Sequence, residues 1–194
     1  MIESDAFVQA LQDIGVDFFT GVPDSILGGI IAELMERRLY TPAVREDEAV
    51  AMAAGAYMSG KIPAVLMQNS GLTNATSPLT SLNYTFKLPV LGFVSLRGEP
   101  GLKDEPQHEL MGQITEEMLS TMRIEWAYLS DDMDIARKQL KEANGHIEAG
   151  RTFFFIVKKG IFGDVKLGKQ VLHNRQNEWT FKSAATPELP TRTV

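Results

Sequence analysis

The sequence predicts a doubly wound α/β domain, built on a parallel sheet of about six strands with helices on both faces. From about residue 4 to residue 157, short apolar stretches alternate with amphipathic stretches of helical period. The short stretches carry apolar residues at successive positions, which is typical of strands covered on both faces. Glycine and N-capping residues separate the stretches, as expected where a helix or strand ends.

The first elements show the alternation clearly. In segment 4–14 an apolar face is followed by Gly15, a natural end for a helix, and segment 17–20 is a short apolar strand. Asp24 or Ser25 can cap the next helix, 26–35. The alternation then predicts strand 41–45, helix 47–59, strand 62–68, a helix within 72–82, strand 90–95, helix 116–122, strand 126–129, helix 133–147 and strand 153–157.

Composition narrows the classes of function. The chain has 194 residues, 44% of them hydrophobic and 23% charged, with a net charge of -6 and a pI near 5.1. An acidic chain is a poor partner for nucleic acid or an anionic membrane, and no apolar run is long enough to span a bilayer. The N-terminus shows no secretion signal, so we expect a cytoplasmic protein. With no cysteine and three separated histidines, we expect no metal centre within this chain.

Two regions differ in character. Residues 1–160 carry the α/β pattern and are expected to form one domain. Residues 161–194 are polar and end in a segment stiffened by Pro187 and Pro190. We therefore expect this second region to be an arm packed on a neighbour, or a connector.

Ligand-binding residues are expected at the carboxyl edge of the sheet, where open parallel sheets hold their ligands. Four loops follow predicted strands there: GVPDS (21–25), REDE (45–48), QNSGLTN (68–74) and RGEPGLKDEPQHELMGQ (97–113). The chain has no G-x-G-x-x-G, no P-loop and no G-x-S-x-G motif. Dinucleotide, P-loop and α/β-hydrolase chemistry are therefore disfavoured.

Glu46 admits two interpretations. It can be a surface carboxylate at the positive end of a helix dipole, which is the common case. Alternatively it faces inward, because the small-residue helix that follows predicts close packing and the neighbouring Asp47 and Glu48 already supply an acidic first turn. Burial disfavours the ionised form of a carboxylate, which would prepare Glu46 to share a proton with a ring nitrogen.

The segment AVREDEAVAMAAGAYMSGKIPAVLMQNSGLTNATSPLTSL, followed by RGEPGLKDEPQH, resembles a known family. It is similar to the pyrimidine-binding domain of the thiamine-diphosphate decarboxylases that act on phosphonopyruvate and sulfopyruvate. The resemblance runs from GVPDS to about Ile114. In that family a glutamate nine positions before a helix glycine binds the N1′ nitrogen of the aminopyrimidine; the matching residues are Glu46 and Gly55.

The resemblance implies a role for each loop. A carboxylic acid at N1′ favours the imino tautomer of thiamine diphosphate, whose thiazolium serves as electron sink for a 2-oxo acid. Pro23 would back the cofactor and Asp24 would relay a proton, a role compatible with N-capping. Thr73 stands where the family usually has glycine, so the backbone turn there is not carried over by the resemblance. The other implied cofactor contacts are Asn69, Ser70, Gly71 and Asn74.

Charged residues of the long loop have both catalytic and ordinary interpretations. His108 is the best candidate for a general acid or base, since histidine titrates nearest neutral pH. Arg97 and Lys103 are candidates for binding a phosphonate or sulfonate, although such residues more often form ion pairs within loops.

A part of the family's machinery is missing from this sequence. Family members hold the diphosphate and Mg²⁺ with a second domain carrying a G-D-G motif, whereas the Gly163-Asp164 step here is followed by Val165. The resemblance therefore implies a diphosphate-binding partner subunit or domain in a homo- or hetero-oligomer, with the active site between the two.

The expected function is the pyrimidine-binding half of a 3-phosphonopyruvate decarboxylase, which forms phosphonoacetaldehyde and CO₂. The α subunit of a sulfopyruvate decarboxylase is the alternative within the family. A non-catalytic binding or regulatory module with the same fold remains a third possibility.

Overall fold

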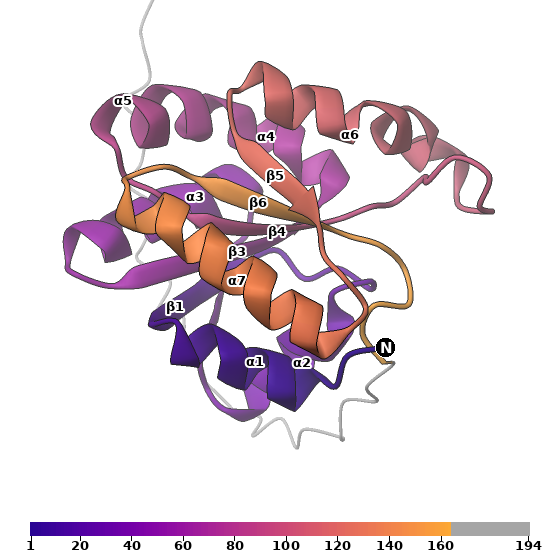
Figure 1. The fold of residues 1–194 in the computed structure, drawn as a ribbon. Coiled ribbons are helices and arrows are strands. Elements are labelled where there is room, and N and C mark those ends of the chain that lie inside the picture. The colour runs from indigo at the N-terminus through magenta and orange to yellow at the C-terminus, as the bar shows by residue number, and fades with distance from the viewer. Residues whose placement is uncertain (164–194) are drawn as a thin grey trace, which may run out of the picture.

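A computed structural model describes residues 1–163 and shows one six-stranded sheet in which all neighbouring strands are parallel. The strand order is β2-β1-β3-β4-β6-β5, and helices cover both faces (Figure 1). The predicted doubly wound α/β fold is thus confirmed. The strands are β1 (Val16–Gly21), β2 (Tyr40–Pro42), β3 (Ile62–Gln68), β4 (Leu91–Ser95), β5 (Glu125–Tyr128) and β6 (Phe153–Val157).

Seven α-helices connect these strands within the described residues. They are α1 (Ser4–Asp13), α2 (Gly28–Glu36), α3 (Glu46–Met58), α4 (Leu72–Pro78), α5 (Tyr84–Phe86), α6 (Glu109–Thr121) and α7 (Met133–Glu148). Short 3₁₀ turns precede α4 (Asn69–Gly71) and α6 (Pro106–His108), and a π-helical turn (Leu79–Asn83) joins α4 to α5.

The sheet separates two hydrophobic cores. Helices α1, α2 and α7 pack on one face, and α3, α4 and α6 on the other. Successive strand residues serve opposite cores: Phe93 faces the first and Val94 the second. Both faces of each inner strand are buried, which explains why the strands read as continuous apolar runs.

Helix α6 begins at Glu109, seven residues before the predicted start at 116. The prediction failed because residues 109–113 are mostly exposed and include Gly112, which favours a helix break by propensity. In the fold Gly112 has a packing role, since a Cβ there would lie 1.7 Å from the carbonyl oxygen of Gly98. Close approach of the β4 loop, rather than a break, explains this glycine.

The other helix and strand boundaries differ less from the predicted ones. Strand β2 ends at Pro42, earlier than the predicted 45, because it pairs only with β1 at the sheet edge. The predicted helix within 72–82 is part of a longer series of helical turns from Asn69 to Phe86. Ile161 and Phe162 are buried, and Ile2 donates a backbone hydrogen bond to Ile161 O at 2.8 Å, so the packed part of the chain extends past residue 160. The rest of the predicted arm lies outside the described residues, apart from Gly163.

No helix within residues 1–163 is long and apolar enough to cross a bilayer. The same part of the chain holds no group of three or more His, Cys, Asp or Glu side chains placed to hold a metal ion.

Candidate functional site

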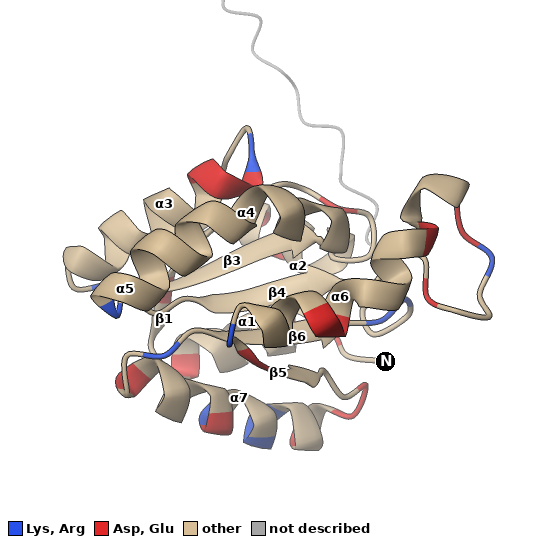
Figure 2. Cartoon of the chain, turned by 90° about the horizontal axis from the view of Figure 1, so that it is seen from above, with Lys and Arg blue, Asp and Glu red and all other residues tan. Residues whose placement is uncertain are grey.

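Glu46 is the first residue of α3 and lies at the carboxyl edge of the sheet. Its side chain is half-buried. The two following carboxylates have local partners: Asp47 pairs with Arg45 at 3.1 Å, and Glu48 accepts a hydrogen bond from Val44 N at 2.8 Å. Figure 2 shows this acidic first turn of α3 beside α4. The three adjacent acids therefore differ in role, and Glu46 is the one directed toward α4.

Contacts from the β3–α4 segment hold the Glu46 side chain. Asn74 Nδ2 donates to Glu46 Oε2 at 2.8 Å. A Cβ on Gly71 would lie 2.5 Å from Glu46 Cγ and 2.7 Å from both Cδ and Oε1, so a larger residue there would displace this carboxylate from its observed position. No residue in the described range hydrogen-bonds to Oε1, which leaves one carboxylate oxygen for a ligand.

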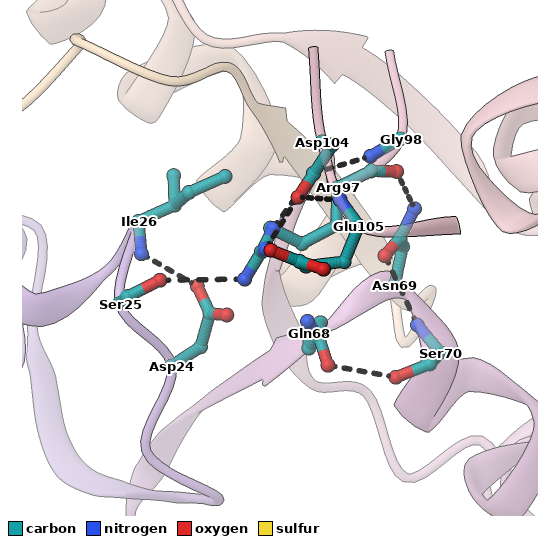
Figure 3. A network of polar contacts seen from close by, with 10 residues as sticks. All are labelled: Asp24, Ser25, Ile26, Gln68, Asn69, Ser70, Arg97, Gly98, Asp104 and Glu105. Atoms are coloured by element: carbon teal, nitrogen blue, oxygen red, sulfur yellow. Dashed lines mark hydrogen bonds and ion pairs between the residues drawn. The ribbon is translucent and has the colours of Figure 1, made fainter. Parts of the chain in front are cut away.

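Asn69 faces into the protein. Its side chain is fully buried, and its amide donates to Arg97 O at 2.8 Å and to Thr115 Oγ1 at 3.1 Å, while Oδ1 accepts from Ser70 N. The residue thus joins the ends of β3 and β4 to α6. A cofactor contact from this amide stays a prediction, whereas Figure 3 shows its contacts with Arg97 and Ser70.

Ser70 and Thr73 complete the loop that supports Glu46. Ser70 Oγ donates to Gln68 Oε1 at 2.9 Å, and Thr73 Oγ1 donates to Ser70 O at 2.8 Å. Thr73 lies within α4 and does not have a positive φ. The threonine therefore fits the backbone here without strain, although glycine is usual at this position in the resembling family.

Asp24 does not cap α2: the helix begins at Gly28 with Leu27 as its N-cap and has no side-chain capping hydrogen bond, so the predicted cap at Asp24 or Ser25 is wrong. The Asp24 carboxylate instead holds the turn that precedes the helix. Its Oδ1 accepts hydrogen bonds from Ile26 N at 2.8 Å and Leu27 N at 3.3 Å, just before α2. Pro23 beside it is exposed. Among residues 1–163 the other oxygen, Oδ2, accepts no hydrogen bond, so the contacts with this turn occupy only one oxygen of the carboxylate.

Arg97 and Asp104 form a bidentate ion pair at the base of the β4–α6 loop (Figure 3). Arg97 Nη2 lies 2.5 Å from Asp104 Oδ1, and Nε lies 2.8 Å from Oδ2. Gly98 N and Glu105 N also donate to this carboxylate, each at 2.8 Å. The hydrogen bonds from Arg97 and then Gly98 hold the pKa of Asp104 well below its usual range. The guanidinium predicted to bind an anion is thus already paired.

His108 closes the same loop. It ends the 3₁₀ turn before α6 and is half-buried, and its Nδ1 is buried with no hydrogen-bond partner in the described part of the chain. Lys103, in the middle of the loop, is exposed. A buried nitrogen without a partner is costly unless something completes it, so His108 remains the best acid–base candidate.

Four contributing residues were missed by the sequence reasoning: Glu99, Asp104, Tyr128 and Lys158. Asp104 organises the loop, and a second ion pair, Lys158 to Glu99 at 2.6 Å, ties the start of the loop to the residue after β6. Lys158 also lies over the Tyr128 ring, 4.8 Å from its centroid. Burial, with smaller effects of Glu116 and Glu99, raises the pKa of Tyr128 to about 12. The charged residues of RGEPGLKDE indicated that this loop could form ion pairs. The sequence did not show which residues pair with one another.

A doubly wound sheet with a half-buried carboxylate at its carboxyl edge defines a ligand-binding α/β domain. A family model described as "Thiamine pyrophosphate enzyme, N-terminal TPP binding domain" matches residues 2–119. The chain belongs to this family. The resemblance noted in the sequence is thereby confirmed.

Two kinds of decarboxylase are similar to this chain in sequence. The chain is 33% identical over 199 residues to the phosphonopyruvate decarboxylase of Streptomyces hygroscopicus, covering 99% of this chain and 49% of that protein. It is 36% identical over 147 residues to sulfopyruvate decarboxylase subunit alpha of Methanococcus maripaludis, covering 73% of this chain and 86% of the subunit. The chain thus spans about half the length of the phosphonopyruvate decarboxylase it matches.

Structural similarity agrees with the fold. Benzoylformate decarboxylase from Polynucleobacter necessarius superposes with a TM-score of 0.64 over 88% of this chain and 33% of that enzyme. The sequence identity is 19%, so this likeness speaks for the fold alone.

Proposed function

We propose that this chain is the pyrimidine-binding half of a thiamine-diphosphate-dependent 2-oxo acid decarboxylase that converts 3-phosphonopyruvate to phosphonoacetaldehyde and CO₂. The observation that carries the proposal is the setting of Glu46. Its carboxylate is held by Asn74 and accommodated by Gly71, with one oxygen open to a ligand. Family membership, together with the phosphonopyruvate and sulfopyruvate decarboxylase relatives, supports a decarboxylase function.

The residues fit the cofactor's aminopyrimidine. Glu46 would present Oε1 to the ring nitrogen, and Asn74 would keep the carboxylate oriented through Oε2. A carboxyl group in this place holds a proton at N1′ and so favours the imino form of the ring. Thiamine diphosphate, when bound, supplies the electron sink for decarboxylation. The chain itself contributes orientation and proton placement.

The neighbouring residues take supporting roles in this proposal. Pro23, Ser70 and Gly71 would contact the cofactor together with Asn74, and Asn69 would act through the backbone that it anchors. Asp24 would relay a proton through Oδ2 while Oδ1 accepts the hydrogen bonds from Ile26 N and Leu27 N. His108 would serve as the second acid or base from the opposite loop.

A diphosphate-binding partner completes the proposed site and supplies the ligands of Mg²⁺. The described chain offers no metal-binding cluster, and its Gly163-Asp164-Val165 sequence departs from G-D-G. The name "subunit alpha" of the Methanococcus relative supports a two-subunit arrangement.

The test compares Glu46→Gln with Asp47→Asn in the assembled complex. Gln keeps the shape of Glu46 but cannot supply the acidic proton, so kcat with 3-phosphonopyruvate should fall by about 10²- to 10⁴-fold while cofactor affinity changes far less. The control changes an acid in the same helical turn and should leave kcat within about twofold. If Glu46→Gln, like the control, keeps kcat within about twofold of wild type, the proposed role of Glu46 is refuted.

Sulfopyruvate decarboxylation is the second candidate. It is favoured by the similarity to sulfopyruvate decarboxylase subunit alpha of Methanococcus maripaludis, because this chain covers 86% of that subunit's length. Steady-state assays with both acids decide the substrate through the ratio of their kcat/KM values. If the complex binds thiamine diphosphate but turns over neither acid, both substrates are excluded; if it binds no cofactor, the chain is a non-catalytic module.

A further inference from the structure

A small cavity of about 110 Å³ opens at the carboxyl edge of the sheet, beside the site already described. It lies where the loops after β1 and β4 meet the residues after β6. Its polar lining comes from Ser25, Arg97, Glu99, Lys103, Asp104 and Lys159. The apolar wall is formed by Ile26, Leu96 and Leu102. We call this cavity the Lys103–Lys159 pocket.

The ion pairs around the pocket leave it cationic. Both of its carboxylates are neutralised: Asp104 by Arg97 with two hydrogen bonds, and Glu99 by Lys158 at 2.6 Å. In residues 1–163 neither Lys103 nor Lys159 takes part in a salt bridge. Two lysine ammonium groups therefore remain to attract an anion.

Arg97 shapes the pocket without being its free charge. Its Nε and Nη2 are committed to Asp104, and Nη1 lies 3.5 Å from Ser25 Oγ. Asp104, and to a smaller extent Asp24, raise the pKa of Arg97, so the proposed proton-relay residue lies near the same guanidinium. Figure 3 shows Arg97 between the Asp24–Ser25 segment and Asp104.

We infer that the Lys103–Lys159 pocket binds the phosphonate or sulfonate end of the substrate. The inference rests on the proposed function and names the recognition site for its substrate class, a tetrahedral oxyanion on a short carbon chain. Lys103 and Lys159 supply the charge, Ser25 supplies a hydroxyl donor, and Arg97 holds the loop. The cavity volume of about 110 Å³ is several times the ~10–15 Å³ that, on the same measure, holds one water molecule, so such a group can enter it.

The kinetic test uses Lys103→Gln, Lys159→Gln and the double variant in the complex with its partner. Each single variant should lose roughly tenfold in kcat/KM for the turned-over acid, mainly through KM, because the ion contact is formed in the ground state as well as the transition state. The double variant should lose more than either. Lys141→Gln, at an exposed lysine on α7, is the matched control and should stay within about twofold of wild type.

A second test separates the pocket from the decarboxylase function. Inorganic phosphate is titrated into the full 194-residue chain at constant ionic strength, and amide shifts are followed by NMR. Saturable shifts at Ser25 and Gly98 that weaken in the lysine variants, but not in Lys141→Gln, are expected. If these shifts appear without turnover of either acid, the anion pocket stands and the proposed function falls. Shifts unaltered by the lysine variants, or KM values equal to the control, overturn the inference.

Discussion

Replacing Asp104 with asparagine tests how the β4–α6 loop is held. Each carboxylate oxygen accepts one hydrogen bond from Arg97 and one from a backbone amide, Glu105 N at Oδ1 and Gly98 N at Oδ2. Asparagine keeps one acceptor oxygen, so two of these four hydrogen bonds are lost. At about 1 kcal/mol each, the free energy of unfolding should fall by about 2 kcal/mol. For a chain of this size the melting temperature should fall by about 4–8 °C.

The pH dependence of this effect has a defined sign. The pKa of Asp104 is lowered in the folded state, chiefly by its hydrogen bonds to Arg97 and Gly98, relative to about 3.9 in an unfolded chain. The folded state therefore binds fewer protons at this group, and its contribution is present above about pH 4 and is lost as the pH falls toward the folded pKa. The stability difference between wild type and Asp104→Asn should thus be largest near pH 7 and should shrink at pH 3.

Urea denaturation at pH 7 and pH 3 measures both quantities. Asp13→Asn is the control, because that carboxylate is 54% exposed and lies 3.7 Å from Arg137, so its loss should cost less than about 0.5 kcal/mol. An Asp104→Asn effect no larger than the control, or one of equal size at both pH values, would show that the ion pair does not stabilise the loop.

Substitutions at three further positions test other contacts. Gly71→Ala would place a Cβ 2.5–2.7 Å from the Glu46 side chain, so kcat/KM of the complex should fall by on the order of 10- to 100-fold; an unchanged value argues against the Glu46 pose. Asn69→Ala leaves the buried partners of the amide unpaired and should cost about 2–3 kcal/mol in urea denaturation, whereas the exposed Asn74→Ala should cost less than about 0.5; similar costs would contradict the bridging role. Asp24→Ala removes the acceptor of the Ile26 and Leu27 amides and should cost about 1 kcal/mol, while Asp24→Asn keeps an acceptor and should cost less. Both Asp24 variants should lower kcat by about 100-fold, and full activity of Asp24→Asn would exclude the proton relay.

The strands were the part of the fold most readable from sequence. Segments 62–68 and 153–157 were predicted with the observed bounds of β3 and β6. These inner strands are buried on both faces, so their sequence is apolar at nearly every position and ends abruptly. The early start of α6 was not readable, because Gly112 gives no local sign that the β4 loop passes beside it.

The candidate site was readable at the level of loops. Placing ligand residues after the strands followed from the parallel architecture, and the structure brings Glu46, Gly71 and Asn74 together. The direction of individual side chains was not readable: Asn69 turns inward to bridge β3, β4 and α6, and Arg97 pairs with Asp104. Such contacts join residues distant in sequence or depend on how a loop folds back.

The amino-acid sequence alone predicts the alternation of strands and helices, the parallel sheet that this alternation implies, and the four loops at its carboxyl edge. Periodicity and capping are local properties, so they can be read along the chain. Only the three-dimensional contacts show how Glu46 is held beside α4 and which cations remain without an acidic partner in residues 1–163. Those outcomes depend on distances of a few ångströms between separate loops, over which a carboxylate is either neutralised or left to bind a ligand.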